Sequence, residues 1–574
     1  MTRLIRNMMR ILLVLPYPLL LLFIFYLLFR KRNYREAIKK NYKWILINTF
    51  SVLAIAIIGF IIYFKLENTI YDFDYVGHWY RALVIKEKFF LDPSSIPQFL
   101  HHSLNYDVYY SYLTAFFQLP LILVKDSYGF FSLGSFIMFF VPSFVCLQVL
   151  YYSHFDRIKV LPAFIAVVLY PLYIVFFDGE TECFGFLMLI MCFMLTVFSK
   201  FDEIDMMDNF AINVFAFLLI FGRRFYLYSL IMMYVCYFIH YLKHYEFKPV
   251  SKKALFDFMK IISSGLLLLA LCLTVYYPFF LRVVTNNYGD TYAYNNKPGK
   301  LTAFITMFSP LVLILSCYGS YILSVVKKKY ILCISMILLL VVPTFLFWQV
   351  QSFERHHYYL IAFPVVVLFT QGLYSLFTNK KLIVLSGLAG TILVLQVGNV
   401  FLFSKNVFPL STPHQTPKVY AEKERVIEFY NYLSSLCSDG SYLFMATGDG
   451  NLNYSTLMNS KLPELPSLNV EEKTNDIIDG FPDLKNIKYV IVSSPVTYSS
   501  KEYQHMYDVI TDALMNDEEI SKMYTLLSEC EIYGVTYYTY SLEQAYTDET
   551  KEYFYQKMIE FYPDYVDFFS SILE

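Results

Sequence analysis

Charged side chains are scarce in this sequence. Asp, Glu, Lys and Arg together make up 16% of its 574 residues, whereas 57% of the residues are hydrophobic. A soluble protein of this length could not bury so many apolar side chains behind so few charged ones. The composition therefore excludes an ordinary soluble protein and indicates a chain that crosses a lipid bilayer several times.

Cysteine is also sparse, and motifs for metal or phosphate binding are missing. Seven of the nine cysteines lie in or beside hydrophobic runs without metal-ligand spacing, so we expect them to pack as small apolar residues. Cys437 and Cys530 are the exceptions, because they could form a disulfide if the C-terminal part lies outside the cell. No Gly-rich phosphate loop is present, since the Thr-Gly-Asp-Gly sequence at 447–450 is typical of a turn.

Long hydrophobic runs dominate the first 404 residues. Each is long enough, or nearly so, to cross a bilayer, and they occupy about 11–29, 44–64, 128–152, 160–177, 182–198, 209–222, 225–242, 257–281, 301–326, 330–349, 358–377 and 382–404. We expect a mainly α-helical, polytopic bundle of about 11–12 transmembrane helices. The first run lacks the cleavage site of a signal peptide, so it either spans the membrane or lies in its interface.

Lysine and arginine indicate the orientation of these helices. Residues 30–43 hold seven Lys or Arg against one Glu, which is typical of a cytoplasmic loop. Alternate counting from this loop places the other basic links inside as well, namely 157–159, 243–253, 327–329 and 380–381. The count requires that the short apolar segment 108–124 be a surface or re-entrant part of one long outer loop, 65–127.

The C-terminal part differs from the rest in charge and in pattern. Residues 411–574 carry 27 acidic and 11 basic side chains, which disfavours nucleic acid as a partner. Helix-like and strand-like segments alternate there, which predicts a small α/β domain. We therefore divide the chain into a hydrophobic segment with a basic loop (1–43), a transmembrane domain (44–404), a linker (405–419) and an extracytoplasmic α/β domain (420–574).

Two acids follow the second hydrophobic run, where the chain is expected to leave the membrane on the outer side. Asp72 and Asp74 point the same way in an extended segment, and a helix starting near Asp74 would place His78 and Arg81 on successive turns. A carboxylate there can act as a general base, and the pair can also bind Mg²⁺ or Mn²⁺ through oxygen. The plainer alternative is that one Asp caps the helix.

Arginines occur at two other outer ends of the predicted helices. Arg223 and Arg224 follow a hydrophobic run at a boundary where the positive-inside rule disfavours arginine. An anion such as a lipid phosphate is therefore expected beside them, and Arg355 is expected to be a second phosphate ligand. Pairing of Arg223 or Arg224 with Glu180, Glu182 or lipid headgroups is the alternative.

The remaining polar groups on this side are candidates for substrate binding. His356 and His357 follow Arg355 and are expected to donate hydrogen bonds, whereas adjacent histidines project in different directions and do not suit one metal ion. Glu180 and Glu182 could orient a sugar or assist Asp74, although a plain solvated turn explains them equally well.

The layout of about residues 40–404 resembles that of the membrane-embedded GT-C glycosyltransferases, which include protein O-mannosyltransferases, aminoarabinose lipid A transferases and bacterial cell-envelope glycosyltransferases. The resemblance rests on a span, a long outer loop that opens with acids, here Asp72-Phe-Asp74, many further spans, and arginines at outer ends. It implies inverting transfer of a sugar from a polyprenyl-phosphate donor to an acceptor hydroxyl, with one of these two acids as the base. No cofactor is required, but the family's adjacent Asp-Glu is replaced by Asp-x-Asp, which leaves Mg²⁺ or Mn²⁺ dependence open. The tryptophan-rich signature of oligosaccharyltransferases is missing.

We therefore expect a glycosyltransferase of a bacterial plasma membrane that decorates a cell-wall polysaccharide, teichoic acid or similar cell-envelope glycan. Asp74 or Asp72 would deprotonate the acceptor, while Arg223, Arg224 and Arg355 would hold the departing polyprenyl phosphate. A lipid-linked glycan flippase is the alternative, but it would need ionisable groups near the bilayer midplane. A noncatalytic scaffold would not explain so many spans or the paired arginines.

Overall fold

The computed structural model divides the chain into two compact units. The membrane unit comprises residues 1–65 and 77–417, and the terminal unit comprises residues 66–76 and 418–574. The structure describes residues 3–71, 74–106, 112–155, 158–169, 179–248, 251–285, 299–401, 417, 419–448, 452–454, 457, 468–471, 473–477, 479–499 and 501–573, without the side chains of 74–76, 104–106, 264, 275, 282–284 and 397–401.

The membrane unit is built of helices that follow the hydrophobic runs, which confirms a mainly helical, polytopic chain. The helices are α1 (Arg3–Val14), α2 (Pro16–Arg30), α3 (Arg32–Leu66), α4 (Asp74–Leu91), α5 (Ile96–Tyr106), α6 (Tyr112–Phe117), α7 (Leu119–Ile122), α8 (Tyr128–Ser135), α9 (Val141–His154), α10 (Leu161–Val168), α12 (Cys183–Leu195), α13 (Met206–Gly222), α14 (Leu227–His244), α15 (Lys252–Val275), α16 (Tyr277–Thr285), α18 (Lys300–Phe308), α19 (Pro310–Tyr321), α20 (Tyr330–Val350), α21 (Tyr359–Thr378) and α22 (Ile383–Phe401). Two π-helical turns, η2 (Phe136–Phe140) and η7 (Ile322–Val326), extend α8 and α19.

Six helices among the described residues are long and apolar enough to cross a membrane. The number rises to eight if the bent pairs α1/α2 and α18/α19 each form one span. This supports a multi-pass membrane protein with fewer full-length spans than the sequence pattern predicts. Part of the difference is length, because the apolar helices α12 and α13 have only 13 and 17 residues.

Proline marks the breaks in the two bent pairs. Pro310 is the first residue of α19, and the preceding Ser309 has a positive φ of 64°, so the helix cannot continue and the two parts differ in direction by 83°. The Ser309 hydroxyl accepts a hydrogen bond from the backbone N–H of Val312, which caps the new helix.

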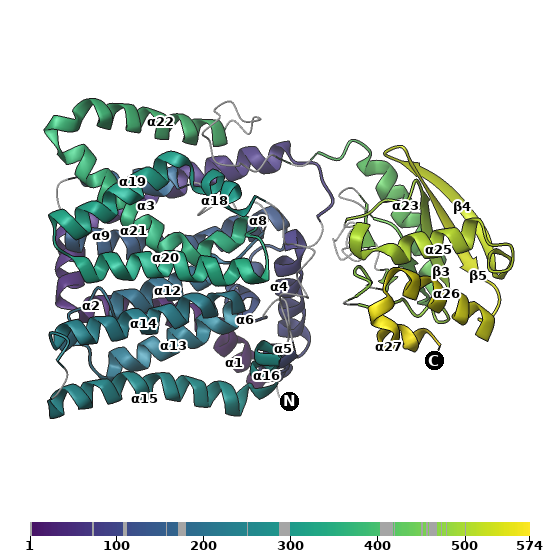
Figure 1. The fold of residues 1–574 in the computed structure, drawn as a ribbon, viewed down its shortest axis with the longest axis horizontal. Coiled ribbons are helices and arrows are strands. Elements are labelled where there is room, and N and C mark those ends of the chain that lie inside the picture. The colour runs from purple at the N-terminus through teal and green to yellow at the C-terminus, as the bar shows by residue number, and fades with distance from the viewer. Residues whose placement is uncertain are drawn as a thin grey trace. The chain divides into compact units, whose positions relative to one another are not determined.

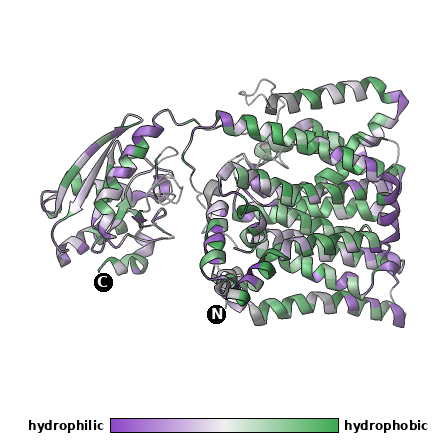
Figure 2. Ribbon diagram, turned by 180° about the vertical axis from the view of Figure 1, so that it is seen from behind, coloured by the Kyte–Doolittle hydropathy of each residue, from purple (hydrophilic) through white to green (hydrophobic). Residues whose placement is uncertain are grey.

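The long helices of the membrane unit lie side by side (Figure 1). Apolar residues cover most of their lengths, and hydrophilic residues gather at the helix ends (Figure 2). Helix α12 is buried along its whole length and lies next to α9, α13 and α21. It is therefore the centre of the bundle, and residues at its ends are enclosed by several neighbouring helices.

One end of the bundle, which we call the lysine end, carries most of the basic links. Helices α9, α14 and α21 end there and α13 begins there, next to Lys327 at the end of η7. Lys31 is buried at this end and its Nζ lies 2.6 Å from Oδ2 of Asp208 in the first turn of α13. Asp208 thus neutralises part of the charge of the basic loop.

The terminal unit is a mixed α/β domain, as the alternating pattern predicts. Its five strands have the order β2-β1-β3-β5-β4. Strand β1 is parallel to β2 and β3, whereas β5 is antiparallel to β3 and β4. The strands are β1 (Tyr442–Met445), β2 (Asn469–Val470), β3 (Tyr489–Ser494), β4 (Tyr524–Ile532) and β5 (Val535–Leu542), and the helices are α23 (Lys423–Leu436), α25 (His505–Met515), α26 (Asp548–Phe561) and α27 (Val566–Phe569).

Both faces of this sheet are covered. Phe444 and Val490 face a core that includes residues of α25 and α26, and Leu443 and Ile491 face a second core that includes residues of α23. The period-two alternation of the strands places neighbouring residues on opposite faces. Ile70 belongs to the second core, so the segment just before the Asp72 loop packs within the terminal unit.

Candidate functional site

The loop that begins with Asp72 leads into α4. This helix begins at Asp74, as expected from the sequence. Asp72, and the side chain of Asp74, lie outside the described residues. His78 is one turn further along and is 3% exposed. Its Nδ1 lies 3.2 Å from the Thr181 hydroxyl, so the helix directs the imidazole into the membrane unit.

The second part of the site is at the N-terminus of α12. Glu180 and Glu182 lie just before this central helix and are 3% and 0% exposed. The Oε2 atom of Glu180 lies 3.3 Å from His78 Nε2. The solvated acidic turn that the sequence left open is therefore excluded for these two residues.

Arg223 joins the two carboxylates. It is the C-cap of α13, where the backbone turns extended, and α13 packs beside α12. Its Nη2 lies 3.1 Å from Glu180 Oε2, and its Nε donates to Glu182 Oε1. The sequence left open whether Arg223 contacts a phosphate or pairs with an acid, and in the structure it pairs with both Glu180 and Glu182.

A fourth segment contributes histidine. The short helix η8 (Arg355–Tyr358) precedes α21, and His356 Nδ1 lies 3.5 Å from Glu180 Oε1. His357 has a different task, since its Nδ1 accepts a hydrogen bond from the backbone N–H of Glu354 and so shapes the turn. We call His78, Glu180, Glu182, Arg223 and His356 the ionic cluster.

Burial controls the charges in this cluster. Burial lowers the pKa of His78 well below its ordinary value, and the nearby Arg223 guanidinium lowers it further, so the imidazole is neutral at pH 7. Burial alone would raise the pKa of Glu182, but Arg223 beside it holds the pKa of that carboxyl below its usual range. Glu182 Oε2 has no hydrogen-bond partner in the described part of the chain. A carboxylate oxygen in this position can accept a further hydrogen bond.

The other arginines lie outside the ionic cluster. Arg355 lines an open cavity of about 510 Å³ between α18 and η8, together with Thr302, Thr306 and Tyr358. Arg224 is half-buried at the start of the 3₁₀ turn η5 (Arg224–Tyr226). Arg81 donates to its own helix at Gly77 O and stacks on the Tyr112 ring. Neither Arg224 nor Arg355 is a member of the ionic cluster, and their expected role as phosphate ligands stays a prediction.

A metal ion suits the ionic cluster less well than the arginine does. One ligand atom each of His78, Glu180 and Glu182 lies within 4.8 Å of the others, which is close enough for a shared cation. Arg223, however, already contacts both carboxylates. A divalent cation would have to displace a guanidinium that fits them well.

Two members of the site have no signal in the sequence. Thr181 bonds to His78, and Tyr226 is fully buried and donates to the backbone carbonyl of Glu182 at 2.8 Å. Gly185 makes room for this tyrosine, because a Cβ atom there would lie 2.2 Å from the ring. Both residues lie close to charged residues in the sequence, but only the contacts of Thr181 with His78 and of Tyr226 with Glu182 mark them as members of the site.

No protein-family model matches this sequence, and no curated protein sequence matches it either.

Proposed function

We propose that this protein is a GT-C-like membrane glycosyltransferase. In this proposal it moves a sugar, with inversion, from a polyprenyl-phosphate donor to a hydroxyl of a cell-envelope glycan such as a wall polysaccharide or teichoic acid. The reaction takes place on the extracytoplasmic face of a bacterial cell membrane. The observation that carries the proposal is the ionic cluster, which brings four distant segments together at one end of the membrane unit.

The energetic cost of the cluster supports a functional role. Burial of two carboxylates and a guanidinium loses several kcal/mol of hydration per ion, and an apolar packing of the same volume is often at least as stable. Ionisable groups inside a membrane protein therefore mark functional sites by default. Glu182 keeps an oxygen without a partner among the described residues, which is more useful to a substrate than to the fold.

The proposed reaction assigns each group a role. The acceptor hydroxyl loses its proton to Asp74 or Asp72, its oxygen bonds to the anomeric carbon, and the bond from that carbon to the phosphate oxygen breaks with its electron pair on the phosphate. Arg224 and Arg355 stabilise the departing polyprenyl phosphate. The ionic cluster orients the sugar through Glu182 and His356. Mg²⁺ or Mn²⁺ bound by Asp72 and Asp74 would supply further charge for the phosphate.

The position of the cluster favours an enzyme over a flippase. Glu182 lies at the start of α12, Arg223 at the end of α13 and His356 before α21. These are helix ends, whereas transporters bind substrate near the middle of the bilayer. One observation favours transport, which is the 83° break between α18 and α19, because broken helices are typical of transporters.

Release of polyprenyl phosphate distinguishes these functions. The purified chain in lipid nanodiscs is incubated with polyprenyl-phosphate hexoses and pentoses and with cell-envelope glycan, and the released polyprenyl phosphate is measured. We expect turnover by the wild type and a loss of about 100-fold or more for Asp74→Asn or Asp72→Asn, as for removal of a general base. Glu87→Gln, an exposed acid of α4, is the matched control. Wild-type turnover by the double Asp→Asn variant would refute the assigned base, and lipid translocation without phosphate release would indicate a flippase.

A further inference from the structure

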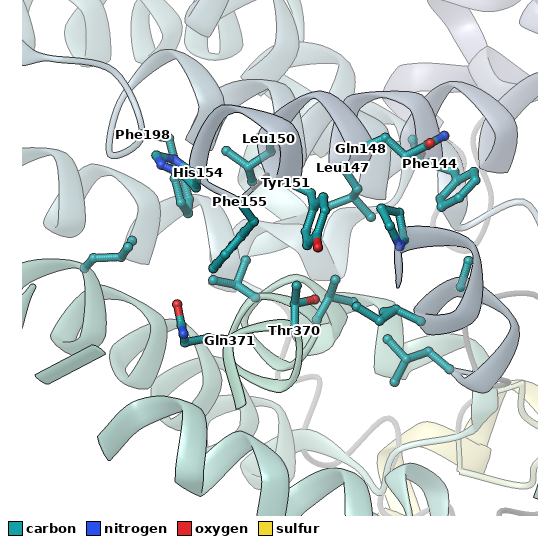
Figure 3. Close-up of a pocket in the computed structure, with 18 of the residues that line it drawn as sticks. Phe144, Leu147, Gln148, Leu150, Tyr151, His154, Phe155, Phe198, Thr370 and Gln371 are labelled. Carbon is teal, nitrogen blue, oxygen red and sulfur yellow. The ribbon is translucent and has the colours of Figure 1, made fainter. Parts of the chain in front are cut away.

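A narrow apolar cavity runs through the membrane unit along α9 (Figure 3). Its lining extends from Phe140 to His154, which is about 20 Å at the rise of an α-helix. The cavity volume is about 90 Å³, room for several water-sized groups in a row. Figure 3 shows Leu147, Tyr151 and Phe155 on one side, with Thr370 and Gln371 of α21 on the other. This shape suits one unbranched hydrocarbon chain.

Basic side chains gather at one end of this cavity. Lys327, Lys329 and His154 line it, and no Asp or Glu does. The Nζ of Lys327 donates to Gln371 Oε1 at 2.9 Å and lies 4.7 Å from the centre of the Phe155 ring. Within the described ranges, neither lysine forms an ion pair. By contrast, Lys31 at the same end of the bundle forms an ion pair with Asp208.

The backbone aims both lysines at the cavity. The π-helical turn η7 ends at Val326, and the N–H of Lys327 donates to Ile322 O. Lys328 then takes a positive φ of 52°, and the N–H of Lys329 donates back to Leu323 O. All three lysines are exposed to solvent, but after this tight reversal Lys327 and Lys329 line the mouth of the cavity and Lys328 does not.

We propose that this cavity binds one anionic phospholipid, with part of an acyl chain along α9 and the phosphate at Lys327 and Lys329. Basic pockets between transmembrane helices recognise anionic headgroups in this way, and an ammonium group with a fixed direction is a good ligand for phosphate. The two lysines lack an acidic partner because the lipid supplies it. This site is independent of the proposed glycosyl transfer.

Its position separates this lipid from the polyprenyl donor. Gln371, beside Lys327, is 15 residues after His356 on the continuous stretch of η8 and α21, which corresponds to about 22 Å along the helix. A donor phosphate held near Arg355 therefore cannot also reach Lys327. A separate lipid of the leaflet at the lysine end fits the second position.

Native mass spectrometry of the purified full chain tests the site. The chain is stripped of lipid in a neutral detergent and titrated with phosphatidylglycerol or with phosphatidylcholine of the same acyl chains. We expect one tightly held phosphatidylglycerol, and affinity about tenfold or more weaker in Lys327→Gln/Lys329→Gln, since each lysine near an anionic lipid contributes appreciably. Lys380→Gln/Lys381→Gln removes two exposed lysines at the same end that do not line the cavity and should bind as the wild type does.

A second variant tests the hydrocarbon part. Ala166 is buried and lines the cavity, so Ala166→Leu should fill it and weaken phosphatidylglycerol binding while all four lysines remain. Equal loss in the Lys380/Lys381 pair, equal binding of phosphatidylcholine, or wild-type affinity in both cavity variants would overturn the proposal. Retention of polyprenyl phosphate in place of phosphatidylglycerol would overturn it as well. The thermal melting temperature of each variant in detergent without lipid shows that it is folded.

Discussion

Arg223 is the residue on which the charge balance of the ionic cluster depends. It is the cation that contacts both Glu180 and Glu182, and its side chain is 10% exposed. The histidine nearest to these acids is neutral, because burial and Arg223 lower the pKa of His78. Loss of the guanidinium would therefore leave two buried acids without compensation.

Replacement of Arg223 should destabilise the membrane unit strongly. We expect Arg223→Met to lower the free energy of unfolding by about 3–5 kcal/mol, as for a buried pair that loses one partner. Thermal melting in detergent measures the effect. Arg224→Met, at the next position, is the control and should cost far less. The triple change Arg223→Met/Glu180→Gln/Glu182→Gln should recover part of the loss, and an unchanged melting temperature for Arg223→Met would contradict the charge balance described above.

Asp476 is a buried acid in the terminal unit. It is fully buried, accepts a hydrogen bond from the Tyr562 hydroxyl at 2.8 Å, and accepts another from the N–H of Met506 in the first turn of α25. Burial raises the pKa of this carboxyl from 3.8 to about 7. The folded state therefore holds a proton at pH values where the unfolded chain has lost it.

The terminal unit should lose stability as the pH rises. Because the folded pKa of Asp476 is the higher one, its contribution is fully present below pH 3.8 and is lost as the pH rises to about 7. Hydrogen exchange of β3 and α25 amides at pH 5 and pH 8, corrected for intrinsic rates, should show less protection at pH 8. Asp476→Asn should remove most of this difference, and Glu518→Gln, an exposed acid, should leave it. Equal pH dependence in both variants would rule out Asp476 as the cause.

Among the elements, α19 and α21 make the closest helix contact of the membrane unit. A Cβ atom on Gly319 would lie 1.9 Å from the backbone O of Leu368, and one on Gly372 would lie 2.0 Å from the O of Leu315. Small residues at such positions let the backbones of transmembrane helices touch. The contact holds the bent α18/α19 pair against the helix that carries His356 at its start.

Substitution of Gly372 should separate these helices. Gly372→Ala is expected to lower the melting temperature in detergent, with a cost of about 1–3 kcal/mol or more for overpacking. Gly387→Ala in α22 adds the same methyl group where nothing lies within 4 Å and should have little effect. Similar melting temperatures for the two variants would show that the bundle relaxes around the extra atom.

The segment before α4 is the second element with a clear role. The N–H of Tyr420 donates to Asn68 O at 2.7 Å, and Ile70 is 1% exposed in the core that contains α23. Asp72 follows two residues later. The start of the proposed catalytic loop thus packs within the terminal unit, and in the proposed reaction this unit would position the loop.

Loss of the Ile70 side chain should loosen this attachment. Ile70→Ala is expected to destabilise the core around α23 by about 2–5 kcal/mol, with faster hydrogen exchange there. It should also slow release of polyprenyl phosphate, because the Asp72 loop is less well positioned. Val419→Ala is the control, because Val419 pairs with Asn68 in the same attachment but its side chain is 65% exposed. Full turnover with faster exchange would show that the reaction does not need this anchor.

At the scale of the whole molecule, the main question is which end of the membrane unit faces the cytoplasm. The basic links gather at the lysine end, which the positive-inside rule assigns to the cytoplasm. The ionic cluster lies at the opposite ends of α13 and α21. The count of hydrophobic runs in the sequence predicts that the terminal unit lies on the outer side, and this orientation stays a prediction.

Labelling of single cysteines tests this orientation. With Cys317, Cys437 and Cys530 replaced by alanine, Asn486→Cys in the terminal unit should react with a membrane-impermeant maleimide on intact cells. Lys328→Cys at the lysine end should react only after permeabilisation. Both positions are exposed, so a difference reports sidedness rather than burial. The reverse pattern would place the ionic cluster on the cytoplasmic face and refute the outer-face reaction.

Local patterns were sufficient to predict the helices of the membrane unit and the α/β alternation of the terminal unit. Hydrophobic length and charge act over a few residues, so the start of α4 at Asp74 can be read along the chain. The same holds for the gathering of ionisable residues at the helix ends. The break at Pro310 was missed, because residues 301–326 were expected to form one continuous span. The number of full-length spans was harder, because short apolar helices such as α12 are buried by their neighbours and not by lipid.

Contacts between distant residues could not be read in this way. Three features depend on how the helices pack: the pairing of Arg223 with both glutamates, the contacts of Thr181 and Tyr226, and the lack of an acid beside Lys327 and Lys329 among the described residues. Sequence spacing says which face of a helix a residue occupies, but packing decides which charge it meets and how much water remains. The residue types therefore came from the amino-acid sequence, and their partners, burial and charge states came from the fold.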